Sequence, residues 1–136
     1  MEVYELKKDM KVFCVQARSF PNDIKDAFGT LINKLPAIEG RTFFGISYEG
    51  KNHKMIYNAA VLETFDGEGK KYGCDSYVIK KGKYLSETLK NWKRNEASIG
   101  QTFKKMSEER NDVTFPCVEW YQGEDVRCMV KIRRRS

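Results

Sequence analysis

The clearest pattern in the chain is an apolar stripe with helical spacing from Ile24 to Leu35. Apolar residues at i, i+3, i+4 and i+7 define one helix face, and Pro21 and Pro36 bracket this stripe as start and stop signals. Runs rich in β-forming residues lie on both sides of it, at residues 11–18, 42–49 and 54–63. A four-residue loop, 50–53, separates the last two runs, so the first half predicts a strand, a helix and a hairpin.

The second half begins after a run rich in glycine and charge at residues 66–71, which is typical of a link between two units. Residues 77–79 favour a strand. Residues 83–92 also look extended, but their leucines and tryptophan satisfy helical spacing as well. The pattern therefore leaves that segment open between strand and helix.

The chain closes with a second helix and a second hairpin. Ile99, Phe103 and Met106 mark one helix face, with Asn95 as the candidate N-cap and an end before Asn111. Strands are predicted at residues 114–121 and 126–132, joined by the turn 122–125. Two tandem strand-helix-strand-strand units predict an α+β fold, with an antiparallel sheet and helices on one of its faces.

Length and composition fit one globular domain over residues 1–136. The chain has a mass of 15.9 kDa, with 40% hydrophobic and 32% charged residues. No run approaches the ~20 apolar residues that a membrane span needs, and the first ten residues lack the apolar core of a signal peptide. We therefore expect a cytoplasmic protein that does not enter a membrane.

The residues that usually hold metals or act as nucleophiles are sparse. The four cysteines contain no CxxC pair and His53, in a turn-like run, is the only histidine, so neither a zinc site nor a histidine-based triad is expected. The cysteines are interpreted as reduced, structural thiols. Residues 67–71 lack the spacing of a phosphate-binding loop. No metal and no cofactor is predicted.

The most informative strand is 115–121, because its alternation places Cys117, Glu119 and Tyr121 on one face and Val118 and Trp120 on the other. If Val118 and Trp120 pack under the helices, Glu119 faces the opposite surface of the sheet. A carboxylate among apolar rings is costly unless it is paired, so Glu119 is a candidate ligand-binding residue. The alternative is an exposed glutamate, or one paired with a neighbouring strand.

Four stretches of the chain resemble the GyrI-like effector-binding domain, which occurs in bacterial AraC-type and MerR-type multidrug-responsive regulators and as a stand-alone protein. They are the 11–18 strand with its following helix, FFGISYE at 43–49, IKKGKY at 79–84 and PCVEWY at 116–121. The resemblance implies a ligand groove between the two halves, with Glu119 at its floor. The aromatic residues it implies around the groove are Tyr121, Trp92, Tyr57, Tyr48 and Phe44.

The resemblance implies a protein that captures hydrophobic, cationic or planar small molecules, since aromatic faces attract cations and a desolvated carboxylate adds charge selectivity. Two other roles found in the family stay open. One is hydrolysis of cyclopropane-bearing DNA-alkylating natural products with Glu119 as the acid or base, and the other is a gyrase-inhibitor-like contact with a protein partner. The basic residues support nucleic-acid binding only weakly, because no reading module accompanies them: Lys90, Lys93, Arg94, Lys131, Arg133, Arg134 and Arg135.

Overall fold

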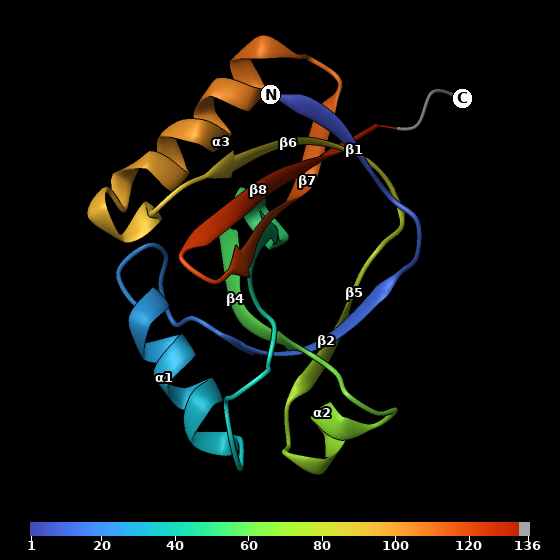
Figure 1. Cartoon of the computed structure of the whole chain (residues 1–136), viewed down its shortest axis with the longest axis vertical. Helices are drawn as coiled ribbons and strands as arrows, with labels where there is room; N and C mark the ends of the chain where they lie inside the picture. Colours follow the sequence, from blue (N-terminus) through green and yellow to red (C-terminus); the bar gives the residue numbers. More distant parts are fainter. Residues whose placement is uncertain (134–136) are drawn as a thin grey trace.

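The computed structural model describes residues 1–133 and shows one curled, antiparallel sheet with helices packed on its outer face (Figure 1). The strand order in the sheet is β1-β6-β8-β7-β3-β4-β2-β5. The strands are β1 (Glu2–Leu6), β2 (Met10–Gln16), β3 (Phe43–Glu49), β4 (Met55–Leu62), β5 (Asp75–Ile79), β6 (Gly82–Leu89), β7 (Val113–Gln122) and β8 (Asp125–Ile132). The helices are α1 (Ile24–Lys34), α2 (Glu68–Lys71) and α3 (Ala97–Glu109), with short 3-10 turns η1 (Lys51–His53) and η2 (Trp92–Arg94).

The predicted α+β class and the two tandem units are confirmed as β2-α1-β3-β4 and β6-α3-β7-β8. The units meet at the centre of the sheet, where β3 pairs with β7 and Gly45 lies opposite Glu119. Strand β1 precedes the first unit but pairs with β6 of the second, and β5 precedes the second unit but pairs with β2 of the first. This exchange of end strands ties the two halves together.

Several predicted boundaries change. The segment 83–92, open between strand and helix, is strand β6 as far as Leu89, followed by η2. The N-cap of α3 is Glu96 and not Asn95. The closing hairpin turns over two residues rather than four, with Gly123 in the left-handed region at φ 64°. Strand β1 was not predicted.

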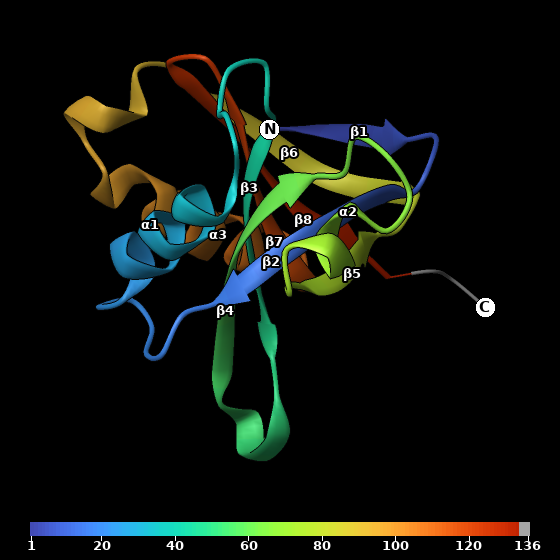
Figure 2. The same ribbon diagram turned by 90° about the horizontal axis from the view of Figure 1, so that it is seen from below.

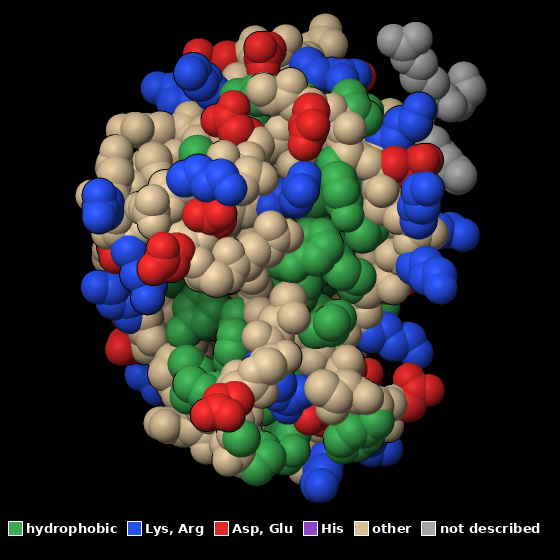
Figure 3. All heavy atoms as spheres, viewed as in Figure 1, with side chains coloured by type: hydrophobic (Ala, Val, Ile, Leu, Met, Phe, Trp, Pro, Cys, Tyr) green, Lys and Arg blue, Asp and Glu red, His purple; other side chains and the backbone are tan. Residues whose placement is uncertain are grey.

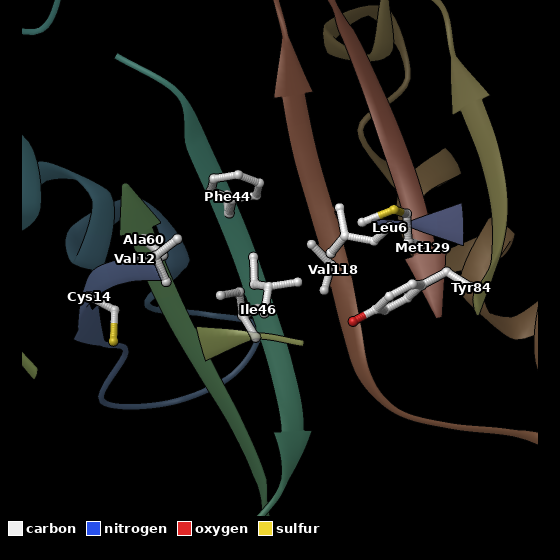
Figure 4. Close-up of a cluster of buried hydrophobic side chains, with 10 residues drawn as sticks. Leu6, Val12, Cys14, Phe44, Ile46, Ala60, Tyr84, Val118 and Met129 are labelled. Carbon is white, nitrogen blue, oxygen red and sulfur yellow. The ribbon is translucent and has the colours of Figure 1, made fainter. Parts of the chain in front are cut away.

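Both faces of the sheet are apolar. On the outer face α1 and α3 lie on the same side of the molecule in both ribbon views (Figures 1 and 2), each over its own cluster of buried side chains. Figure 2 also shows the β3–β4 hairpin extending away from the rest of the fold. On the inner face a third cluster, which includes Ile46 and Tyr84, is enclosed by the curled sheet (Figure 4). Figure 3 shows hydrophobic side chains exposed near the middle of the face seen in Figure 1, with lysines and arginines mainly towards its edges.

This second apolar face reverses the expected orientation of β7. Val118 is fully buried in the inner cluster and Trp120 packs against it, whereas Cys117 and Tyr121 contact the cluster under α3. Glu119 therefore faces the helices and not the surface opposite them. The alternation of the strand was correct, but alternation alone does not tell which of two apolar faces carries the helices.

Candidate functional site

A pocket of about 1230 Å³ opens between α1 and α3 on the outer face of the sheet. Its walls are apolar, with Phe28 and Ile32 from α1 and Ile99 and Phe103 from α3. The central strands form its floor, where β3 contributes Phe43 and Ser47 and β7 contributes Cys117, Glu119 and Tyr121. Because drug-sized ligands occupy pockets of about 300–1,000 Å³, this one is large enough for a multi-ring compound.

Glu119 lies at the centre of this floor, with 9% of its surface exposed. Its Oε1 accepts two hydrogen bonds, from the hydroxyl of Tyr121 at 2.5 Å and from that of Tyr57 at 2.9 Å. Within residues 1–133 no hydrogen bond or ion pair reaches its other oxygen, Oε2. The carboxyl group is therefore held through one oxygen, and its other oxygen has no hydrogen-bond partner among these residues.

Burial raises the pKa of Glu119 above its usual range, and the hydrogen bonds from Tyr121 and Tyr57 act in the opposite direction. Burial also raises the pKa of both tyrosines, with a further contribution from the nearby Glu119. Both hydroxyls therefore keep their protons and remain hydrogen-bond donors at neutral pH.

Aromatic rings surround the carboxyl group. The ring of Tyr121 lies 5.2 Å from that of Trp92 and 6.0 Å, edge to face, from that of Phe28. The ring of Tyr57 contacts Phe28 at 6.4 Å and Phe20 at 5.4 Å. The Nζ of Lys93 lies 5.9 Å from the centre of the Trp92 ring, so this ring already attracts a cation.

Three of the five aromatic residues that the resemblance implied lie at this site, namely Tyr121, Trp92 and Tyr57. Phe44 and Tyr48 lie on the inner face. Phe44 is fully buried against Trp120, and Tyr48 stacks on Tyr77 at 5.7 Å. The reason is the alternation of β3, in which Gly45 and Ser47 face the pocket while their neighbours face inward.

Sequence reasoning missed Gly45, which makes room for the Tyr57–Glu119 pair. A Cβ atom at this position would lie 2.0 Å from the Tyr57 hydroxyl oxygen and 2.5 Å from Glu119 Oε1. A glycine in the middle of an apolar strand often marks a close approach of another group, so the signal was present in the sequence FFGIS. Phe20 and Phe28 were missed as well, since a helix stripe does not show which of its residues line a pocket.

The remaining chemistry of the pocket is modest. Burial raises the pKa of the Cys117 thiol to about 11, so it stays protonated and is a poor nucleophile. Cys14 and Cys128 are buried, which raises their pKa values to about 12, and like Cys117 they form no disulfide. Over residues 1–133 there is no group of three His, Cys, Asp or Glu side chains that would hold a metal ion. The polar chemistry that the pocket offers is therefore mainly that of the Glu119 carboxyl group and its two tyrosine donors.

Other residues raised by the sequence lie elsewhere. His53 is exposed and pairs with Glu49 at the tip of the β3–β4 hairpin. Lys131 donates to the carbonyl oxygen of Lys81, and Arg134 and Arg135 lie outside the described residues. None of the helices in the described range is long and apolar enough to cross a membrane.

A scan against protein-family models finds no match, and a search of curated proteins finds none either. Solved structures match in fold. VCH_CASS2, an integron cassette protein of Vibrio cholerae, aligns with a TM-score of 0.67 and 12% identity, covering 97% of this chain and 95% of that one. SAV2435, solved bound to tetraphenylphosphonium, aligns with a TM-score of 0.66 and 15% identity over 96% and 93%. The C-terminal domain of EcmrR aligns with a TM-score of 0.60 and 12% identity over 98% and 97%. At these identities the likeness is one of fold.

Proposed function

We propose that this protein is a GyrI-like small-molecule-binding protein, which captures hydrophobic cations and planar aromatic compounds in the pocket between α1 and α3. The observation that carries the proposal is Glu119, a carboxyl group held at the floor of an apolar pocket by two tyrosines. Burying a carboxyl group costs free energy, so a carboxyl group that is buried at the floor of an open pocket is a candidate for binding a ligand. The proposed place of action is the cytoplasm.

Two further points support the ligand class. The rings of Trp92, Tyr121 and Phe28 offer flat, polarisable faces on which a delocalised cation or a planar compound gains both contact area and electrostatic attraction. The similar fold of SAV2435 was solved with tetraphenylphosphonium, a cation with four phenyl rings. That compound is therefore the first ligand to try.

The test is a titration of tryptophan fluorescence with tetraphenylphosphonium, in the wild type and in Glu119→Gln. Glutamine keeps the shape and can still accept the tyrosine hydrogen bonds, so the variant removes the charge alone. We expect saturable binding that weakens about tenfold or more in Glu119→Gln, because the attraction of a desolvated ion pair is worth at least about 1.4 kcal/mol. Glu39→Gln removes an exposed carboxyl group from a loop and is the matched control.

Equal affinity in the wild type and in Glu119→Gln would show that the charge of Glu119 does not contribute to ligand binding. No binding of tetraphenylphosphonium, of a planar cation or of a planar neutral compound would overturn the proposed function.

Hydrolysis is a second candidate, and the same carboxyl group favours it. Burial raises the pKa of Glu119, which brings it closer to the neutral pH at which a general acid or base works best. Following compound integrity by mass spectrometry during the titration separates the two functions. Intact recovery of every bound compound, strained cyclopropanes included, supports binding alone, whereas conversion by the wild type and not by Glu119→Gln makes the protein an enzyme.

A further inference from the structure

The two oxygens of Glu119 have different surroundings. Oε1 is saturated, because it accepts the hydroxyls of both Tyr57 and Tyr121. Oε2 has no protein partner within residues 1–133, while Glu119 itself lines the pocket. A proton on this carboxyl group would therefore reside on Oε2, the oxygen that accepts no hydrogen bond. The pocket thus presents either a hydroxyl donor or a negative charge at the same atom.

Among residues 1–133 no lysine, arginine or histidine forms an ion pair with this carboxyl group. Its strand partners are Gly45 on β3 and Cys128 on β8, and the protonated groups of Tyr57 and Tyr121 complete its contacts. The other titratable and charged groups that line the pocket are Cys117 and Tyr121 of β7, Lys25 of α1, Lys93 of η2 and Glu96 before α3. Tyr57 of β4 and Cys128 of β8 are buried beside Glu119 and do not line the pocket. None of the three rim charges forms an ion pair with Glu119 among the described residues.

We propose that the pocket binds two classes of ligand through Glu119 Oε2: hydrophobic cations, each of which replaces the carboxyl proton, and neutral hydrogen-bond acceptors, which bind the protonated carboxyl group. This inference rests on the proposed function and adds the second ligand class and the proton exchange. When a cation enters, the O–H bond of Glu119 breaks, the proton passes to solvent and the electron pair stays on Oε2. When a neutral acceptor enters, the same O–H donates to it and no proton leaves.

The two classes have opposite pH profiles. A cation needs the ionised carboxylate, so its apparent affinity rises tenfold per pH unit until Glu119 is fully ionised and then levels off. A neutral acceptor needs the protonated form, so its affinity is level at low pH and falls tenfold per unit once Glu119 ionises. Burial raises the pKa of Glu119, so both changes occur at a higher pH than they would at an exposed glutamate.

The experiment compares tetraphenylphosphonium with triphenylphosphine oxide, a neutral compound that carries phenyl rings on phosphorus and an oxygen acceptor. Dissociation constants are measured by isothermal titration calorimetry from about pH 5 to about pH 9, at each pH in two buffers that are effective there and differ in ionisation enthalpy. We expect close to one proton released per tetraphenylphosphonium at the low end of this range, and close to none per triphenylphosphine oxide.

Two variants separate proton exchange from other pH effects. In Glu119→Gln the cation binds weakly with no pH dependence, while the oxide keeps most of its affinity because the glutamine amide N–H donates in place of the carboxyl. In Tyr121→Phe the ring stays and a hydrogen bond that favours the ionised form is lost, so the pH at which cation affinity levels off moves upward. Glu39→Gln, on an exposed loop, leaves both profiles unchanged.

The outcomes for this inference differ from those for the proposed function. Saturable cation binding that is flat across the pH range and releases no proton overturns the inference and leaves the proposed function intact. Parallel profiles for the two compounds also overturn it, because one carboxyl group then does not govern both. Absence of binding by either compound at every pH overturns the inference, and the proposed function with it if planar compounds also fail.

Discussion

Gly45→Ala is predicted to destabilise the protein and to damage the site, although it adds a single methyl group. The new Cβ would lie 2.0 Å from the hydroxyl oxygen and 2.8 Å from Cζ of Tyr57, and 2.5 Å from Glu119 Oε1. Ordinary contacts to carbon are about 3.5–4.0 Å, so both partners must move by more than 1 Å or so. Tyr57 has no room to do this because it is fully buried, and a shift of Glu119 into the pocket would break its hydrogen bond with Tyr57.

Two costs follow from this overlap. Forcing an extra methyl group into a packed site costs about 1–3 kcal/mol. Moving the Tyr57 hydroxyl also breaks its 2.9 Å hydrogen bond to Glu119, and a buried polar group left unpaired costs about 1–3 kcal/mol. We therefore expect Gly45→Ala to lower the free energy of unfolding by about 2–6 kcal/mol and to weaken ligand binding.

Urea denaturation followed by circular dichroism measures this change. The matched control is Gly29→Ala in α1, where no atom lies within 4 Å of the added Cβ. Alanine in a helix interior is favoured over glycine by about 1 kcal/mol, so this control should be as stable as the wild type or more so. A Gly45→Ala protein within about 0.5 kcal/mol of the wild type would refute the close approach on which the site depends.

Further predictions test the rest of the fold and the site. Glu68→Gln leaves the buried Arg41 without its counter-charge and lowers the free energy of unfolding at neutral pH by about 3–5 kcal/mol in urea denaturation. Because hydrogen bonding to Arg41 holds the folded-state pKa of Glu68 down to about 2, below its unfolded value, this stabilisation is complete above about pH 5 and is lost as the pH falls towards about 2; a pH-independent difference between the two proteins would contradict this account. In fluorescence titrations Trp92→Phe should abolish most of the ligand-induced change in emission, because Trp92 lines the pocket. Trp120→Phe should retain that change, because Trp120 lies on the inner face. The reverse result would place the ligand inside the curled sheet. Tyr48→Phe should keep ligand affinity within about twofold of the wild-type value, because Tyr48 lies on the inner face. A loss of about tenfold would show that Tyr48 belongs to the binding site.

The tandem units could be predicted from sequence because their signals are local. The stripe of α1 and the hairpins are read within windows of about a dozen residues. Strand β1 escaped prediction because it has one buried residue, Leu6, and pairs with β6, about 80 positions away along the chain. Its stability comes from a distant partner, which no local pattern reports.

Sequence reasoning could place the residues of the candidate site that lie on a single strand. It could not place the contacts that depend on how neighbouring strands are aligned. Alternation predicted that Glu119 and Tyr121 share a face of the strand, and the structure adds the hydrogen bond between them. The pairing of Tyr57 with Glu119 depends on β3 lying between them with a glycine at position 45. Phe44 is the neighbour of Gly45 in β3, so its side chain points to the opposite, inner face of the sheet.

The net charge of +6 conflicts with a pocket for cations only if charge acts at long range. The Debye length is about 8 Å at physiological ionic strength, so distant lysines are largely screened and mainly affect the rate of encounter. Locally, Lys25, Lys93 and Glu96 give the pocket lining one net positive charge while Glu119 is protonated. Exchange of that proton for a cation leaves the total unchanged, because the charge that Glu119 gains is the one that the cation neutralises. The bound cation therefore adds no repulsion to the pocket, and the equilibrium depends on the pH and on the aromatic contacts.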